Sequence, residues 1–167
     1  MDLDLFGDVP DDDLALLDIV EHFGQVQAQK TSKYIKSFVV DSIKVDFVNY
    51  SRYPWIDDAL EEDGLRLASP KDIAAMKIYA IQNRGSKKDF IDLYFLLQHF
   101  SLESILDFYT QKYPNYSMFR TRMALTYFED AENQESPVLF EKLDWKKVKE
   151  AISKEVRQFD WNKYIEQ

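Results

Sequence analysis

The first residues of the chain organise the rest of it, and they read Met1-Asp2-Leu3-Asp4-Leu5-Phe6. The apolar residues of this stretch are typical of a buried β-strand. Because side chains alternate between the two faces of a strand, Asp2 and Asp4 share one face. Two carboxylates at that spacing can hold a divalent cation between them. The same Asp-x-Asp pattern also occurs in turns and at helix starts, so spacing alone leaves both interpretations open.

A third carboxylate favours the metal interpretation. Asp46 lies within a second strand-like run, Ile43-Lys44-Val45-Asp46-Phe47-Val48. The period of two places Asp46 and Lys44 on one face of that strand, opposite the apolar residues between them. We therefore expect Asp2, Asp4 and Asp46 to converge on one metal site.

Between these two strands the sequence predicts a helix and an antiparallel meander. A helical pattern begins at Pro10 and runs to about Phe23, with the acids 11–13 as its solvated first turn, which the helix dipole favours. Residues 25–48 lose the helical period and alternate as strands instead. Thr31-Ser32 and Asp41-Ser42 are the expected turns of the meander.

The second half of the chain is predicted to be helical. Residues 49–68 form a connector, in which Tyr53-Pro54-Trp55 is the expected packing anchor and Glu61-Glu62-Asp63-Gly64 a surface turn. Ser69-Pro70-Lys71-Asp72 combines an N-cap serine, a proline and an acid, and so predicts a helix start. That helix should run to Arg84. Ser86-Lys87-Lys88-Asp89 repeats the pattern, and further helices are expected at about 101–112, 116–131 and 144–160.

Together these elements predict an α+β fold. A small mixed or antiparallel sheet occupies residues 1–68, and a helical region over residues 69–167 packs on it as one structural unit. At 167 residues the chain is long enough for a single domain with a substantial core.

One lysine stands out in the first of the C-terminal helices. Lys77 is centred in the apolar run from Ile73 to Ile81. Its stem either covers apolar surface while the ammonium reaches water, or the ammonium points into a cleft toward a phosphate or carboxylate. Arg84 lies two turns further on nearly the same face, so both cations could line one groove. Asp92 is an acid among apolar neighbours, whereas the place of Asp89 after Ser86 explains it as a helix cap.

Composition excludes several classes of protein. The 46% hydrophobic and 15% aromatic content excludes global disorder. The absence of cysteine excludes disulfides and thiolate metal sites, and two histidines far apart in sequence do not suggest zinc. A net charge of −9 argues against strong nonspecific binding to nucleic acid. The chain has no signal peptide and no run of eighteen apolar residues, which predicts a soluble protein of the cytoplasm.

Three stretches of the chain resemble the AbiEii/AbiGii toxin family. They are DLDLF at the start, VDF in the later strand, and LASPKDIAAMKIYAIQNRGSKKDFIDLYFLL over residues 67–97. This family comprises nucleotidyltransferases of the DNA polymerase β-like superfamily, found in bacterial toxin–antitoxin and phage-defence (abortive infection) systems. The resemblance covers roughly residues 1–100.

The resemblance implies a role for each candidate residue. Asp2 and Asp4 would bind metal with Asp46 as a third ligand, Lys77 and Asp92 would be catalytic, and Lys77 and Arg84 would contact the nucleotide phosphates. Asp89 is a weaker candidate for the acidic motif. Two Mg²⁺ ions would activate an attacking hydroxyl and neutralise the triphosphate during transfer of a nucleotide from an NTP. The acceptor would be RNA, such as a tRNA, or protein, and a cognate antitoxin would be the protein partner.

The chain departs from the superfamily pattern at its start. The superfamily places a glycine-rich, phosphate-cradling turn ahead of the paired aspartates, and here Met1 immediately precedes Asp2. Two classes of function follow: a nucleotidyltransferase toxin, or a non-catalytic remnant of that fold that acts as an interaction module. We expect this chain by itself to transfer no nucleotide. We also expect it to self-associate through residues 1–6 and the 25–48 meander.

Overall fold

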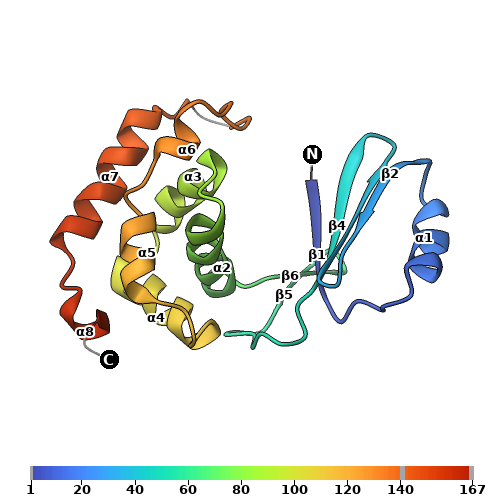
Figure 1. Cartoon of the computed structure of the whole chain (residues 1–167), viewed down its shortest axis with the longest axis horizontal. Helices are drawn as coiled ribbons and strands as arrows, with labels where there is room; N and C mark the ends of the chain where they lie inside the picture. The colour runs from blue at the N-terminus through green and yellow to red at the C-terminus, as the bar shows by residue number, and fades with distance from the viewer. Residues whose placement is uncertain (1, 140–141, 166–167) are drawn as a thin grey trace. The chain divides into compact units, whose positions relative to one another are not determined.

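The computed structural model describes residues 2–139 and 142–165 and confirms the α+β fold (Figure 1). By internal contacts the chain divides into two compact units, Met1–Pro54 and Trp55–Gln167. The domain boundary expected after residue 68 stays a prediction. In the described part of the chain, no helix is long and apolar enough to cross a membrane.

A four-stranded mixed sheet forms the first unit. Its strand order is β1-β4-β3-β2, where β1 is Asp2–Gly7, β2 is Val26–Thr31, β3 is Ile35–Val40 and β4 is Ile43–Asn49. The meander β2-β3-β4 is antiparallel as predicted, and its second turn places Asp41 and Ser42 at positive φ (47° and 69°). β1 pairs in parallel with β4 and forms an edge of the sheet.

Helix α1, Asp13–Glu21, packs on one face of this sheet (Figure 1). Leu16 and Val20 of the helix join Phe38 and Val40 of β3 in a buried core, with Val45 and Phe47 of β4 packed against it. The predicted start of the helix at Pro10 is wrong. The Asp12 carboxylate accepts hydrogen bonds from the amides of Leu14 and Ala15, both at 3.0 Å, and so fixes the first turn beyond the proline.

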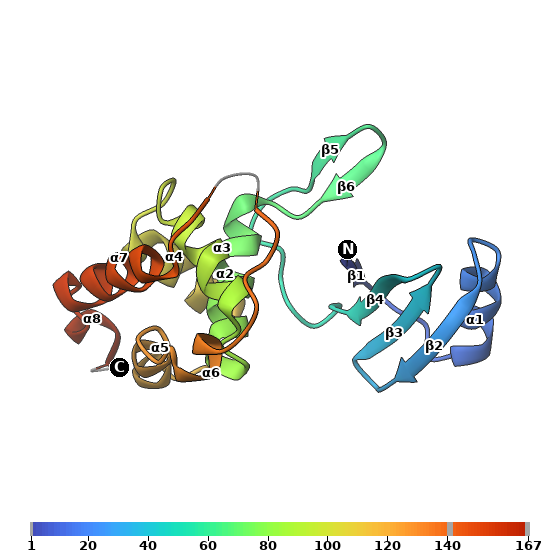
Figure 2. The same ribbon diagram turned by 90° about the horizontal axis from the view of Figure 1, so that it is seen from above.

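The second unit begins with a hairpin that the sequence did not predict as strands. β5, Leu60–Glu62, pairs antiparallel with β6, Leu65–Leu67, and Figure 2 shows this hairpin extending from the helices. Asp63 and Gly64 form the expected turn at φ 51° and 79°, the two positive φ values that a tight hairpin requires.

Seven helices are described in the second unit. They are α2 (Pro70–Asn83), α3 (Lys87–Leu96), α4 (Leu102–Lys112), α5 (Met118–Ala124), α6 (Glu129–Glu132), α7 (Trp145–Gln158) and α8 (Asn162–Ile165). The single helix expected over residues 116–131 is wrong, because the chain turns after buried Leu125. This turn brings Phe128 against Phe90 and Trp145, with ring centroids 4.9 and 5.9 Å away.

A buried ion pair joins the beginning of the second unit to two of its helices. The Lys112 ammonium lies 2.6 Å from the Asp72 carboxylate, and both side chains are fully buried. Asp72 also accepts hydrogen bonds from the Ser69 hydroxyl and the amides of Ile56 and Asp57. Burial by itself raises the pKa of Asp72, but the hydrogen bonds from Lys112, Ser69 and Ile56 outweigh it and hold this pKa below its usual value. The Lys112 ammonium also lies 4.6 Å from the ring centroid of Trp55, the expected anchor.

We predict that Lys112→Met destabilises the second unit by about 3–5 kcal/mol, because it leaves the Asp72 carboxylate buried without its cation. Urea unfolding followed by circular dichroism measures the change. Lys146→Met is the matched control, because Lys146 is exposed and its ion pair with the exposed Glu150 is long, at 3.8 Å. Equal midpoints for the two variants would show that the buried pair adds nothing to stability.

Candidate functional site

The sheet of the first unit presents the three predicted metal-binding aspartates on one face. In the parallel register Asp4 lies opposite Asp46, and Asp2 lies opposite Lys44. Residues opposite each other on neighbouring strands point to the same side of a sheet. Because Val45 and Phe47 of the same strand pack toward α1, the aspartates occupy the other face.

That Asp2, Asp4 and Asp46 lie on one face of the sheet therefore agrees with the prediction made from the sequence. Among the described residues, no group of three or more His, Cys, Asp or Glu side chains is arranged to hold a metal ion. The convergence of all three carboxylates on one cation stays a prediction.

Asp46 has two carboxylate oxygens in different situations. Oδ2 forms an ion pair with the Lys44 ammonium, whereas Oδ1 is buried and has no hydrogen-bond partner among the residues that the structure describes. An unsatisfied buried carboxylate oxygen is costly unless a cation or donor reaches it. Lys44 was expected on this face but not as part of the site. Its ion pair with Oδ2 supplies part of the compensation.

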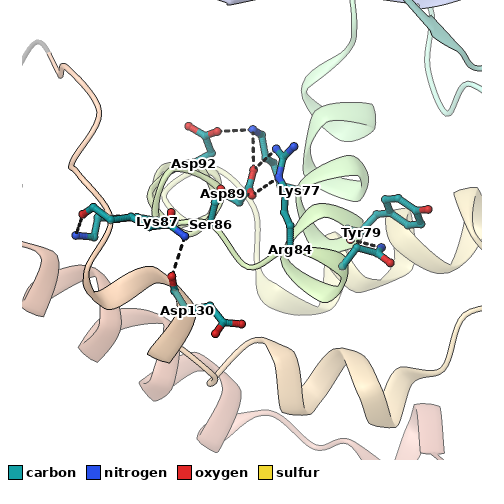
Figure 3. Close-up of polar contacts among 10 residues, drawn as sticks. Lys77, Tyr79, Arg84, Ser86, Lys87, Asp89, Asp92 and Asp130 are labelled. Carbon is teal, nitrogen blue, oxygen red and sulfur yellow. Dashed lines mark hydrogen bonds and ion pairs between the residues drawn. The ribbon is translucent and has the colours of Figure 1, made fainter. Parts of the chain in front are cut away.

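A second cluster of charges lies where α2 meets α3, and Figure 3 shows it around Asp89. The Arg84 guanidinium donates from Nε and Nη2 to the two oxygens of Asp89, each at 2.8 Å. The Lys77 ammonium lies 3.5 Å from Asp89 and 2.5 Å from Asp92. The Ser86 hydroxyl also donates to the Asp89 carboxylate.

The turn between the two helices makes this cluster possible. Gly85 has φ 51°, a left-handed conformation that reverses the chain directly after Arg84. A Cβ at Gly85 would also come within 3.4 Å of the Ile81 carbonyl oxygen. The reversal packs α3 against α2, so the first turns of α3 carry Asp89 and Asp92 beside the cations of α2.

Burial differs sharply within the cluster. The Asp89 side chain is fully buried, whereas Lys77, Asp92 and Arg84 are 23%, 44% and 57% exposed. Burial raises the pKa of Asp89, but the hydrogen bonds from Arg84 and Ser86 and the charge of Lys77 outweigh it and hold this pKa below its usual value. Asp89 is therefore a fixed anion that orients two partly exposed cations.

The structure corrects the interpretation of Asp89 as a helix cap. Ser86 does occupy the N-cap position of α3, but its side chain caps no backbone amide and instead binds Asp89. The prediction that Asp92 reaches Lys77 or Arg84 is confirmed by its ion pair with Lys77. The Lys77 ammonium is thus held between two carboxylates. This agrees with the interpretation that it points toward a carboxylate rather than simply reaching water. That Lys77 and the aspartates of the sheet face one cleft stays a prediction.

These features define a class of protein: an α+β fold with acidic side chains on one face of a mixed sheet and a Lys–Arg–Asp cluster in its helical unit. Residues 1–167 match the family model described as "Nucleotidyl transferase AbiEii toxin, Type IV TA system". The chain belongs to this family. It is accordingly a nucleotidyltransferase toxin of the type IV toxin–antitoxin systems, in which the toxin has a cognate antitoxin.

A relative supports the same relationship over most of the chain. An uncharacterized protein of Aquifex aeolicus (strain VF5) is 32% identical over 160 residues, which cover 92% of this chain and 75% of the relative. No solved structure matches the chain.

We predict that Asp89→Asn lowers the free energy of unfolding by about 3 kcal/mol near neutral pH, because Arg84 and Lys77 lose their shared anion. Because the folded-state pKa of Asp89 is lowered, its contribution is present in full above the unfolded value of about 3.9 and is lost as the pH falls through the folded value. The difference from wild type should therefore be constant between pH 7 and pH 5. It should shrink below about pH 4.

Urea unfolding at a series of pH values measures this prediction. Asp92→Asn is the control, because Asp92 is partly exposed and its removal leaves Lys77 with Asp89. A stability loss for Asp92→Asn as large as that for Asp89→Asn would contradict the central position of Asp89.

Proposed function

We propose that the function of this protein is to transfer a nucleotide from an NTP to an RNA acceptor, with divalent metal at the aspartates of the first unit. That the chain by itself transfers no nucleotide stays a prediction. The observation that carries the proposal is the Lys77–Asp89–Arg84 cluster. A fully buried carboxylate there holds an ammonium and a guanidinium that are both partly exposed. Preorganised cations of this kind bind phosphate oxygens and stabilise charge that develops during transfer.

The two carboxylates around Lys77 have different roles in this proposal. Asp89 is buried and keeps the cations in place throughout the reaction. Asp92 is 44% exposed, so a nucleotide phosphate can replace it as the partner of the Lys77 ammonium. Asp92 then becomes available near the phosphates, which fits the catalytic position that the family resemblance implies for it.

The carboxylates of the sheet suit Mg²⁺ in their chemistry. The bare Oδ1 of Asp46 is a hard oxygen ligand, and Asp4 lies directly opposite it, with Asp2 two residues away on the same face. Mg²⁺ there would activate the attacking hydroxyl and neutralise the triphosphate. Lys44 would have to release Asp46 Oδ2 for this oxygen to bind metal as well.

Two further parts of the proposal concern partners. Transfer of label from an NTP to RNA would distinguish the enzyme from the non-catalytic interaction module, which would bind nucleotide without transferring it.

The proposed self-association uses the edge strand β1, where Leu3 and Leu5 are 48% and 40% exposed. Light scattering of the purified chain tests it, and a monomer mass would refute it.

We predict that Lys77→Met abolishes NTP binding and leaves the protein folded, or even more stable, because Asp89 keeps its bidentate ion pair with Arg84 and Asp92 is partly exposed, so no buried carboxylate loses its last cation. Isothermal titration calorimetry with each NTP and Mg²⁺ measures binding, and thermal unfolding measures stability. Lys71→Met on the same helix is the matched control, because the partner of Lys71 is the exposed Asp57. Lost stability with retained binding would make Lys77 a structural residue.

We predict that Asp46→Asn weakens Mn²⁺ binding by about tenfold or more, because it removes the charge of the central carboxylate. Mn²⁺ replaces Mg²⁺ here because electron paramagnetic resonance counts the free ion directly. Asp18→Asn is the control, an exposed carboxylate on α1 on the other side of the sheet. Equal Mn²⁺ affinity of the two variants would place the metal elsewhere.

A further inference from the structure

Positive charge gathers in one segment of this acidic chain. Residues 25–54 contain five basic residues and two acidic ones, whereas the whole chain has a net charge of −9. Two of the five have carboxylate partners: Lys36 pairs with Asp13, and Lys44 with Asp46. The other three form no ion pair within the described part of the chain, and they are Lys30, Lys33 and Arg52.

Two of these cations surround an exposed aromatic ring. The Arg52 guanidinium lies 4.1 Å from the ring centroid of Tyr34 and 5.4 Å from that of Tyr53. The Lys33 ammonium lies 5.6 Å from the Tyr34 centroid, and Tyr34 is 46% exposed. We call Lys33, Tyr34, Arg52 and Tyr53 the Tyr34 patch.

The backbone holds the Tyr34 patch in place. The Ser32 hydroxyl accepts a hydrogen bond from the Ile35 amide at 3.1 Å and donates to the Ile35 carbonyl, which fixes the turn between β2 and β3. The Asn49 amide donates to the Tyr34 carbonyl at 2.8 Å and ties this turn to the end of β4. The aromatic platform is therefore preorganised, which reduces the entropy lost on binding a ligand.

We propose that the Tyr34 patch binds unpaired nucleotides of the RNA acceptor. A base can stack on the exposed Tyr34–Arg52 pair, while Lys33 and the nearby Lys30 contact phosphates. An acidic protein surface would need the cations alone, whereas the flat tyrosine–guanidinium platform matches a nucleobase. This inference deepens the proposed function, since it assigns the acceptor of the same reaction to a surface.

The position of the patch fits that role. Asn49, which contacts the Tyr34 backbone, follows Asp46 by three residues on β4. At the rise of a β-strand this separation is about 10 Å, the span of one or two nucleotides. Positions three apart on a strand point to opposite faces, so an RNA strand that stacks on Tyr34 would have to pass around the end of β4 to bring a neighbouring nucleotide to the aspartates on β1 and β4.

The test is fluorescence anisotropy of a labelled 12-nucleotide single-stranded RNA of mixed sequence, titrated with the full chain without NTP or metal. Tyr34→Ala should weaken binding by about tenfold, the value of one stacked base, and Tyr34→Phe should keep it. Arg52→Lys should fall between wild type and Arg52→Ala, because it keeps the charge but loses the stacking plane. Lys33→Ala should reduce the salt dependence by about one phosphate contact.

Lys146→Ala is the matched charge control, because this exposed lysine belongs to α7 of the other unit. Several outcomes would overturn the proposal: equal losses for Lys146→Ala and Arg52→Ala, unchanged binding by Tyr34→Ala, or no binding by the wild-type chain. If the chain binds polyglutamate more tightly than RNA, and the variants of the Tyr34 patch lose that binding, the patch would be reassigned to an acidic protein partner.

The binding experiment also separates this inference from the proposed function. Asp46→Asn should keep wild-type affinity for RNA, since it changes no residue of the Tyr34 patch. If the patch binds RNA but the chain does not bind metal, the assignment of the patch holds and the metal-dependent reaction is overturned. If the chain binds metal and NTP but the patch variants keep wild-type affinity for RNA, only the assignment of the patch is overturned.

Discussion

The second unit depends on the buried ion pair between Asp72 and Lys112. Two fully buried charges are stable only if nearly all of their hydrogen-bonding capacity is used, and Asp72 receives donors from Lys112, Ser69 and the Ile56 and Asp57 amides. These contacts bind the first residues of the unit, the start of α2 and the end of α4 to one carboxylate. The position of α2 in turn sets where Lys77 and Arg84 lie, so the candidate site rests on this interaction.

The carboxylates of Asp72, Asp89 and Asp46 differ in what compensates their charge, and this difference separates structural residues from candidate site residues. The cation paired with Asp72 is itself fully buried, which is the arrangement of a structural residue. Asp89 is equally buried, but its cations are partly exposed and can therefore meet a ligand. Asp46 is compensated on one oxygen only, and its second oxygen has no hydrogen-bond partner in the structure. In the proposed function, a nucleotide at the cations of Asp89 and a metal ion at Asp46 complete the balance of charge.

The distribution of charge reconciles an acidic protein with the RNA acceptor that we propose for it. The net charge of −9 argues against nonspecific attraction to nucleic acid. In this family member Lys33 and Arg52 nevertheless lie beside the exposed ring of Tyr34. A small cationic platform on an acidic protein favours local, stacking-dependent contacts over long-range attraction.

Local structure and most of the candidate residues could be predicted from the amino-acid sequence alone. Alternation in residues 25–48 predicted the meander, Ser69-Pro70 predicted the start of α2, and the apolar surroundings of Lys77 marked it as more than a surface lysine. Only the tertiary structure decided the parallel pairing of β1 with β4, the partnership of Asp72 with Lys112 and the central place of Asp89. The physical reason is that local propensity and periodicity act over a few residues. The partner of a buried charge is instead chosen by which distant segments pack together, as the separation of 40 positions between Asp72 and Lys112 shows.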